Sequence, residues 1–98
     1  MFNDLHVECK IERLENGINV WHFVSKKEGE GNAKEALKRV VEIAKKENYE
    51  YVVVNMGNKG QKDSAEFLSN LGFNIIESEP DHVTGEIEVE ESDKLIEI

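Results

Sequence analysis

A run of six residues, Tyr51 to Met56, is the feature that most constrains the fold. It is almost continuously apolar, and three of its members are valines. Such a run predicts a strand that is buried on both faces inside a sheet with a parallel neighbour. Residues 33–47, just before it, carry apolar side chains at helical spacing. With a strand ahead of that helix, the segment predicts a βαβ unit with a right-handed crossover.

An antiparallel hairpin is predicted before this unit. Residues 5–11 alternate between apolar and polar side chains, which is the period of a half-buried strand. Asn16-Gly17 follows, and a two-residue turn at this pair predicts a second strand over Ile18–Ser25. That turn places Glu15 opposite Ile18. It also puts Trp21 and Phe23 together on one face of the sheet, and His22, Cys9 and Ile11 on the other.

The remainder of the sequence predicts a second helix and two closing strands. The helix is expected over about residues 61–71, with Gly72 as its C-terminal stop, just as Asn48 is expected to stop the first helix. Strands are expected over residues 73–77 and 83–89. The order β-β-α-β-α-β-β predicts an α/β (α+β) fold around a mixed sheet, in one domain that spans residues 1–98.

The formal net charge is −9, and the acidic residues gather at the C-terminal end. Residues 77–98 hold nine acidic residues against Lys94 alone, a net charge of −8. This balance argues against nucleic acid as a partner, because such binding rests on neutralising phosphates. The acidic surface suits either solubility or a basic protein partner. A single cysteine, Cys9, predicts no disulfide and no cysteine-based metal site. We find no membrane or signal segment in the sequence and expect a cytoplasmic protein.

Two glycine-rich segments lie between a predicted strand and a predicted helix, where backbone N–H groups and the helix dipole favour an anion. In the second segment, Gly57 and Gly60 are three apart and Lys62 follows no glycine, so the G-x-x-x-x-G-K-[ST] phosphate loop fails. In the first, Lys34 takes the third glycine position of a dinucleotide fingerprint. Nucleotide-binding proteins are therefore disfavoured.

The first segment has a better counterpart. Glu28-Gly29-Glu30-Gly31-Asn32-Ala33 precedes a long helix, and Leu71-Gly72-Phe73 closes the second helix. In this order they resemble the GNAT superfamily of acetyl-CoA-dependent N-acetyltransferases, whose signature is [QR]-x-x-G-x-[GA]. A second register, Lys26 to Gly31, keeps a basic residue first, but the register that starts at Glu28 gives the more usual helix and strand spacing. The resemblance spans Val20 to Phe73.

This resemblance implies an acyl-CoA N-acyltransferase fold, with acetyl-CoA as cosubstrate and an amine as acceptor, carried by a small molecule or a protein. In that family, loop amides hold the cofactor pyrophosphate at the helix N-terminus, and the two central strands splay so that pantetheine pairs with backbone. Here those strands are residues 20–25 and 51–56. The implied cofactor-binding residues are Val24, Glu28, Gly29, Glu30, Gly31, Asn32, Ala33 and Asn58.

The sequence departs from the family pattern at three points. Glu28 stands where the signature has Arg or Gln, and Leu68 stands where many members carry a tyrosine that protonates the departing thiolate. Leucine cannot supply a proton. The usual N-terminal helices have no counterpart before residue 5, so we expect a homodimer that covers a sheet face or extends the sheet. His22 is the candidate base, because its ordinary pKa suits neutral pH.

Two functions remain open at this stage. The first is acetyl transfer to an amine by direct attack. The alternative is a catalytically degenerate GNAT-fold interaction or regulatory module that acts through its acidic C-terminal surface.

Overall fold

The computed structural model of the chain describes residue 4 and residues 7–25, 32–57 and 63–91. The element order is the predicted one. The elements are β1 (Val7–Arg13), β2 (Gly17–Ser25), α1 (Asn32–Lys46), β3 (Tyr51–Gly57), α2 (Asp63–Asn70), β4 (Asn74–Ser78), β5 (His82–Glu88) and the short 3-10 helix η2 (Val89–Glu91).

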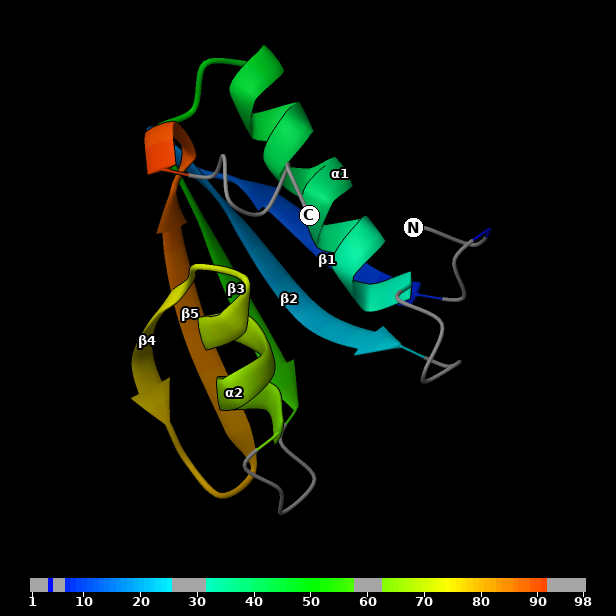
Figure 1. Cartoon of the computed structure of the whole chain (residues 1–98). Helices are drawn as coiled ribbons and strands as arrows, with labels where there is room; N and C mark the ends of the chain where they lie inside the picture. The colour runs from blue at the N-terminus through cyan, green and yellow to red at the C-terminus, as the bar shows by residue number, and fades with distance from the viewer. Residues whose placement is uncertain (1–3, 5–6, 26–31, 58–62, 92–98) are drawn as a thin grey trace.

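The strands form one five-stranded mixed sheet in the order β1-β2-β3-β5-β4 (Figure 1). β2 and β3 are parallel, as the βαβ prediction requires, and every other neighbouring pair is antiparallel. β5, the last of the described strands along the chain, therefore lies between β3 and β4. The predicted fold class is confirmed.

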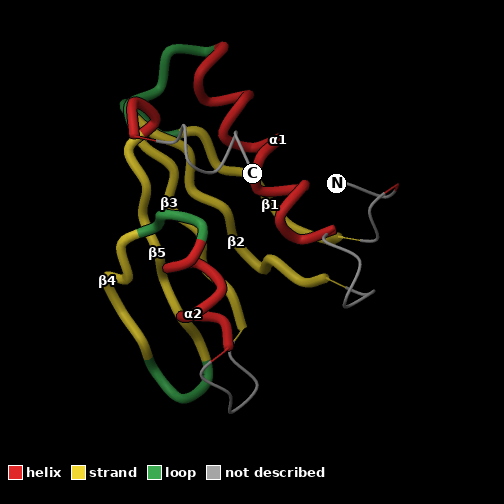
Figure 2. The backbone as a smooth tube through the Cα atoms, viewed as in Figure 1, coloured by secondary structure: helices red, strands yellow, loops and turns green. Residues whose placement is uncertain are grey.

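Both helices pack on the same face of the sheet (Figures 1 and 2). A single hydrophobic core lies between them and the strands, and it includes Leu37 of α1, Leu68 of α2, Val54 of β3 and Val83 of β5, all fully buried. Right-handed crossovers from β2 to β3 and from β3 to β4 move in the same direction across the sheet, so they place both helices on one face. The described residues leave the opposite face of the sheet without a helix.

Both predicted helix stops are confirmed. Asn48 has a φ of 64°, and the Tyr49 N–H donates to the Ala44 carbonyl at 2.8 Å. Gly72 has a φ of 100°, and the Phe73 N–H donates to the Leu68 carbonyl at 3.0 Å. These are left-handed C-terminal caps, a conformation that Gly and Asn reach most readily.

The predicted hairpin turn is displaced by one residue, which shifts the β1 partner of each β2 residue near the turn by two. Arg13, not Glu15, is opposite Ile18, and the Leu14 N–H donates to the Gly17 carbonyl at 2.8 Å. The turn therefore lies at Glu15-Asn16, and Gly17 belongs to β2. Gly17 lacks a Cβ because the ring of Tyr51, its partner on β3, occupies that space; an added Cβ would lie 2.5 Å from Cζ. Close packing, not turn geometry, explains this glycine.

Candidate functional site

β2 and β3 pair regularly over the first half of β2 and then shift by one residue. The register runs from Gly17 opposite Tyr51 to Val20 opposite Val54, and resumes with Phe23 opposite Met56. The pairing of β2 with β1, its other neighbour, shows a register shift at the same place. β2 thus contains one extra residue, a β-bulge, and Figure 1 shows β2 and β3 diverging toward their C-terminal ends. We call this opening the fork.

The bulge separates side chains that the sequence placed together. Trp21 is 40% exposed and its indole N–H donates to Glu12 at 3.1 Å, whereas Phe23 is 2% exposed and packs in the core. The predicted common face for Trp21 and Phe23 is therefore wrong, because simple alternation fails across a bulge. His22 is exposed in the bulge with a φ of 53°, a left-handed conformation that is uncommon outside glycine.

The fork opens at the end of the sheet where α1 begins (Figure 1). Of the predicted cofactor-binding residues, Asn32 and Ala33 lie in the first turn of α1, and the backbone of Val24 lies in the last part of β2, opposite Glu8. The first-turn N–H groups of a helix have no partner within it, and the dipole favours an anion there. The remaining predicted residues, Glu28, Gly29, Glu30, Gly31 and Asn58, lie outside the described residues.

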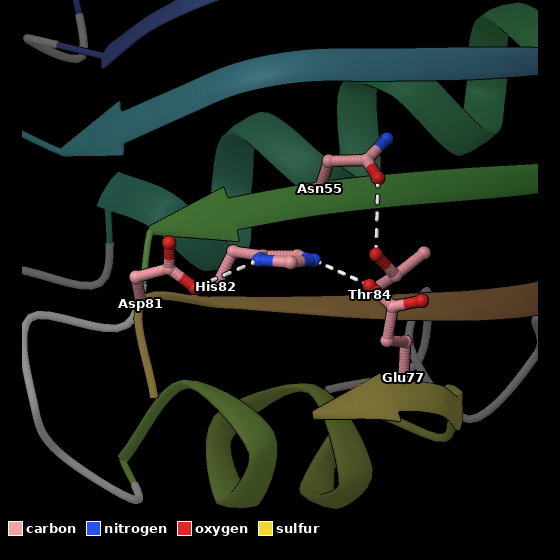
Figure 3. Close-up of polar contacts among 5 residues, drawn as sticks. All are labelled: Asn55, Glu77, Asp81, His82 and Thr84. Atoms are coloured by element: carbon pink, nitrogen blue, oxygen red, sulfur yellow. Dashed lines mark hydrogen bonds and ion pairs between the residues drawn. The ribbon is translucent and has the colours of Figure 1, made fainter. Parts of the chain in front are cut away.

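A row of polar side chains crosses three strands beside the fork. The Asn55 side-chain amide donates to Asn19 Oδ1 at 2.7 Å and to the Val20 carbonyl at 3.1 Å. The Thr84 hydroxyl donates to Asn55 Oδ1 at 3.0 Å (Figure 3). The row joins β2, β3 and β5 through half-buried groups. Sequence reasoning missed it, because β5 reaches its place beside β3 only through the fold.

The hairpin between β4 and β5 carries a second polar group. His82 Nδ1 lies 3.1 Å from Asp81 Oδ1, and Nε2 lies 2.5 Å from Glu77 Oε1 (Figure 3). Hydrogen bonds to Asp81 and then to Glu77 raise the pKa of His82, and the bond to His82 lowers the pKa of Asp81. In the sequence, the only sign of this group was that Asp81 and His82 are adjacent at a predicted turn. The sequence assigned His82 to the surface, and its side chain is indeed 42% exposed.

Leu68 and Cys9, which the sequence analysis also considered, lie in or against the core. Leu68 is fully buried in α2 and lies against Gly85, where an added Cβ would be 3.1 Å from Leu68 Cδ1. Cys9 is half-buried against the core, as the alternation of β1 predicted, and burial raises the pKa of its thiol. Leu68 has no proton to donate, and Cys9 packs against the core.

A groove among the described residues lies elsewhere, around the start of β3. Its volume is about 750 Å³, and it is lined by Lys45, Asn48, Tyr49, Glu50, Tyr51, Glu86, Glu88, Val89 and Glu90. It does not include any predicted site residue. Over the described ranges, no three His, Cys, Asp or Glu side chains come together in a way that would hold a metal ion. In the same ranges no helix has the length and apolar character needed to cross a membrane.

Known proteins resemble this chain in structure. An acetyltransferase of the GNAT family from Staphylococcus aureus Mu50 superposes with a TM-score of 0.69 at 18% identity, over 86% of this chain and 60% of that one. A Bacillus subtilis acetyltransferase in complex with CoA gives 0.67 at 14% identity, over 85% and 68%. The ribosomal-protein-S5-alanine acetyltransferase of Vibrio fischeri gives 0.57 at 18% identity, over 88% and 54%.

These comparisons show the fold. No protein-family model matches the sequence, and no curated protein matches it. The chain spans about 60% of the length of the Staphylococcus aureus protein. The resemblance to GNAT acetyltransferases that the sequence motifs indicated is thus confirmed at the level of the fold.

Proposed function

We propose that the protein binds acetyl-CoA in the fork and transfers the acetyl group to an amine by direct attack. The observation that carries the proposal is the register shift in β2 between Val20 and Phe23, which opens β2 and β3 at the sheet end where α1 begins. The fold that the chain shares with GNAT acetyltransferases, one of them solved with CoA, supports the same conclusion.

The described residues fit such a ligand at two points. The first-turn N–H groups of α1, at Asn32 and Ala33, suit a pyrophosphate because a helix N-terminus favours negative charge. A β-bulge disrupts the ladder locally, so the β2 backbone from His22 to Val24 has polar groups that an amide-containing arm can pair with. Residues 28–31 would complete the pyrophosphate contact.

Bound acetyl-CoA would supply a thioester, whose carbonyl carbon bonds to the amine nitrogen while the carbon–sulfur bond breaks. The chain must then accept the ammonium proton and tolerate a departing thiolate. His22, exposed in the bulge, is the candidate for the first task. Leu68 is buried in the core and has no proton to donate, so the thiolate leaves without an acid from this position. Loss of a general acid lowers rates by about 10²- to 10⁴-fold, so turnover should be slow.

Thermal unfolding with and without acetyl-CoA tests the proposal. A ligand at about 100 times its dissociation constant stabilises a folded protein by roughly 2.7 kcal/mol, so acetyl-CoA should raise the melting temperature. Gly31→Glu should abolish this rise. Lys46→Gln, which makes the same change in charge at the other end of α1, should keep it. An unchanged melting curve at millimolar acetyl-CoA would overturn the proposal in favour of the interaction module.

Three expectations stay predictions: an amine acceptor on a small molecule or a protein, a basic protein partner, and a homodimer. Sedimentation of the full chain tests the last of these, and a monomer at about 100 μM would contradict it, because obligate dimers assemble well below that concentration.

A further inference from the structure

The Asn55 side chain lies at the vertex of the fork. Val20 is the last β2 residue in register before the shift, and Asn55 lies between Val54 and Met56, the β3 residues on either side of that shift. From there its amide nitrogen donates to the Val20 carbonyl and to Asn19 Oδ1. Both contacts therefore join β3 to Asn19 and Val20, the last residues of β2 that pair in regular register before the bulge.

The orientation of this amide is fixed by chemistry. The Val20 carbonyl can only accept a hydrogen bond, so the atom facing it at 3.1 Å must be the Asn55 nitrogen. The Asn55 oxygen is left facing the Thr84 hydroxyl, which donates to it at 3.0 Å. Both polar atoms of the Asn55 side chain are thus engaged, and contacts with β2 and β5 hold it in one position. Figure 3 shows the contact with Thr84 of β5.

We propose that Asn55 is a positioning residue that fixes the point at which β2 parts from β3, and so sets the shape of the fork for its ligand. The inference rests on the proposed acetyl-CoA site. Asn55 does not need to touch the ligand. It acts through Val20, because the strand that follows Val20 carries the bulge and the backbone that the ligand would pair with.

The variant Asn55→Asp tests the two hydrogen bonds that Asn55 donates and keeps the one that it accepts. The aspartate has nearly the same shape and still accepts from Thr84, but it cannot donate to Val20 or Asn19 and places a carboxylate oxygen against both acceptors. A buried acceptor that loses its hydrogen-bond donor changes an equilibrium constant by about tenfold. The dissociation constant for acetyl-CoA should therefore rise about tenfold or more. Acidification should reverse part of this loss, because a protonated carboxyl regains one donor.

Two matched variants sharpen the result. Thr84→Val keeps the shape and removes only the bond to Asn55 Oδ1, so affinity should fall by about threefold at most. Asn19→Ala removes one of the two acceptors and should raise the dissociation constant by about threefold. Should Asn55→Asp fail to fold, Asn19→Ala carries the test, and wild-type affinity in it would overturn the inference.

Amide hydrogen exchange gives a readout that needs no ligand. Exchange at residues 21–23 should accelerate about tenfold in Asn55→Asp, while exchange at Val52 and Val54 in the core should stay near the wild-type rate. Equal acceleration at both places would mean a general loss of stability and would overturn the positioning role. If the wild type does not bind acetyl-CoA, the proposed function fails, and the exchange rates still decide the role of Asn55. Unchanged exchange and unchanged affinity in Asn55→Asp would overturn the inference itself.

Discussion

The two ends of β3 are built in opposite ways. At the first end, the Tyr51 ring covers Gly17, the Glu50 N–H donates to the Asn16 carbonyl at 2.8 Å, and the Val89 N–H donates to the Glu50 carbonyl at 2.9 Å. At the other end, β2 bulges away, and a Cβ added to Gly57 would meet no atom within 4 Å. Packing and backbone hydrogen bonds close one end of the strand pair, whereas the other end stays open at the fork, where we propose that acetyl-CoA binds.

The largest effect is expected from the core that supports the open end. Leu68→Ala should lower the free energy of unfolding by about 2–5 kcal/mol, because Leu68 is fully buried and its truncation leaves a cavity. Urea denaturation measures this loss. Leu14→Ala, in a side chain that is 36% exposed beside the hairpin turn, is the control and should change the free energy by about 0.5 kcal/mol or less. Equal losses of unfolding free energy in both variants would mean that the packing of Leu68 in the core does not stabilise the fold.

The two ends themselves can be compared with a matched pair of glycine substitutions. Gly17→Ala should lower the free energy of unfolding by about 1–3 kcal/mol, because the new methyl group collides with the Tyr51 ring. Gly57→Ala should change it by about 0.5 kcal/mol or less, because the space beside Gly57 is open. Both values come from chemical denaturation. A loss at Gly57 as large as that at Gly17 would contradict the distinction between a closed and an open end.

A smaller effect concerns pH and the hairpin that borders the open end. The folded protein raises the pKa of His82 above its ordinary value of about 6.5, so the added stability is complete below that value and is lost as the pH rises through the folded-state pKa. The denaturation midpoint of the wild type should therefore fall over this interval relative to His82→Gln. Because the cluster is exposed, salt should weaken the difference. A midpoint difference that is flat from pH 5.5 to 9 would contradict a stabilising role for the hydrogen bonds of His82 with Asp81 and Glu77.

The sequence predicted what local signals determine. Periodicity and end residues such as Asn48 and Gly72 gave the element order and the helix stops, because each depends on residues close together in the chain. The bulge at Trp21 and His22 was missed because no glycine marks it, although alternation breaks there. One misplaced turn also misplaced every pairing in that hairpin, because it shifted the partners on β1 by two residues up to the bulge and by one beyond it; the two faces were exchanged only beyond the bulge.

The polar row could not be predicted at all. Asn19 and Asn55 meet through the register of β2 with β3, and Thr84 joins them only because β5 returns to lie beside β3. No spacing in the sequence encodes either register. Of the predicted cofactor-binding residues, the structure describes Val24, Asn32 and Ala33, which lie at the fork end of the sheet. Their role in binding stays a prediction, which came from a family motif and not from composition.

The strand order also bears on how the chain folds as it is synthesised. β5 occupies the interior position between β3 and β4, yet it is the last of the described strands to leave the ribosome. Until residues 82–88 emerge, β4 has no neighbour and β3 presents a bare, valine-rich edge. Unpaired apolar edges are sites of aggregation in partly folded chains. A released fragment that ends before His82 should therefore aggregate, whereas a fragment that ends after η2 contains all the strands of the described sheet.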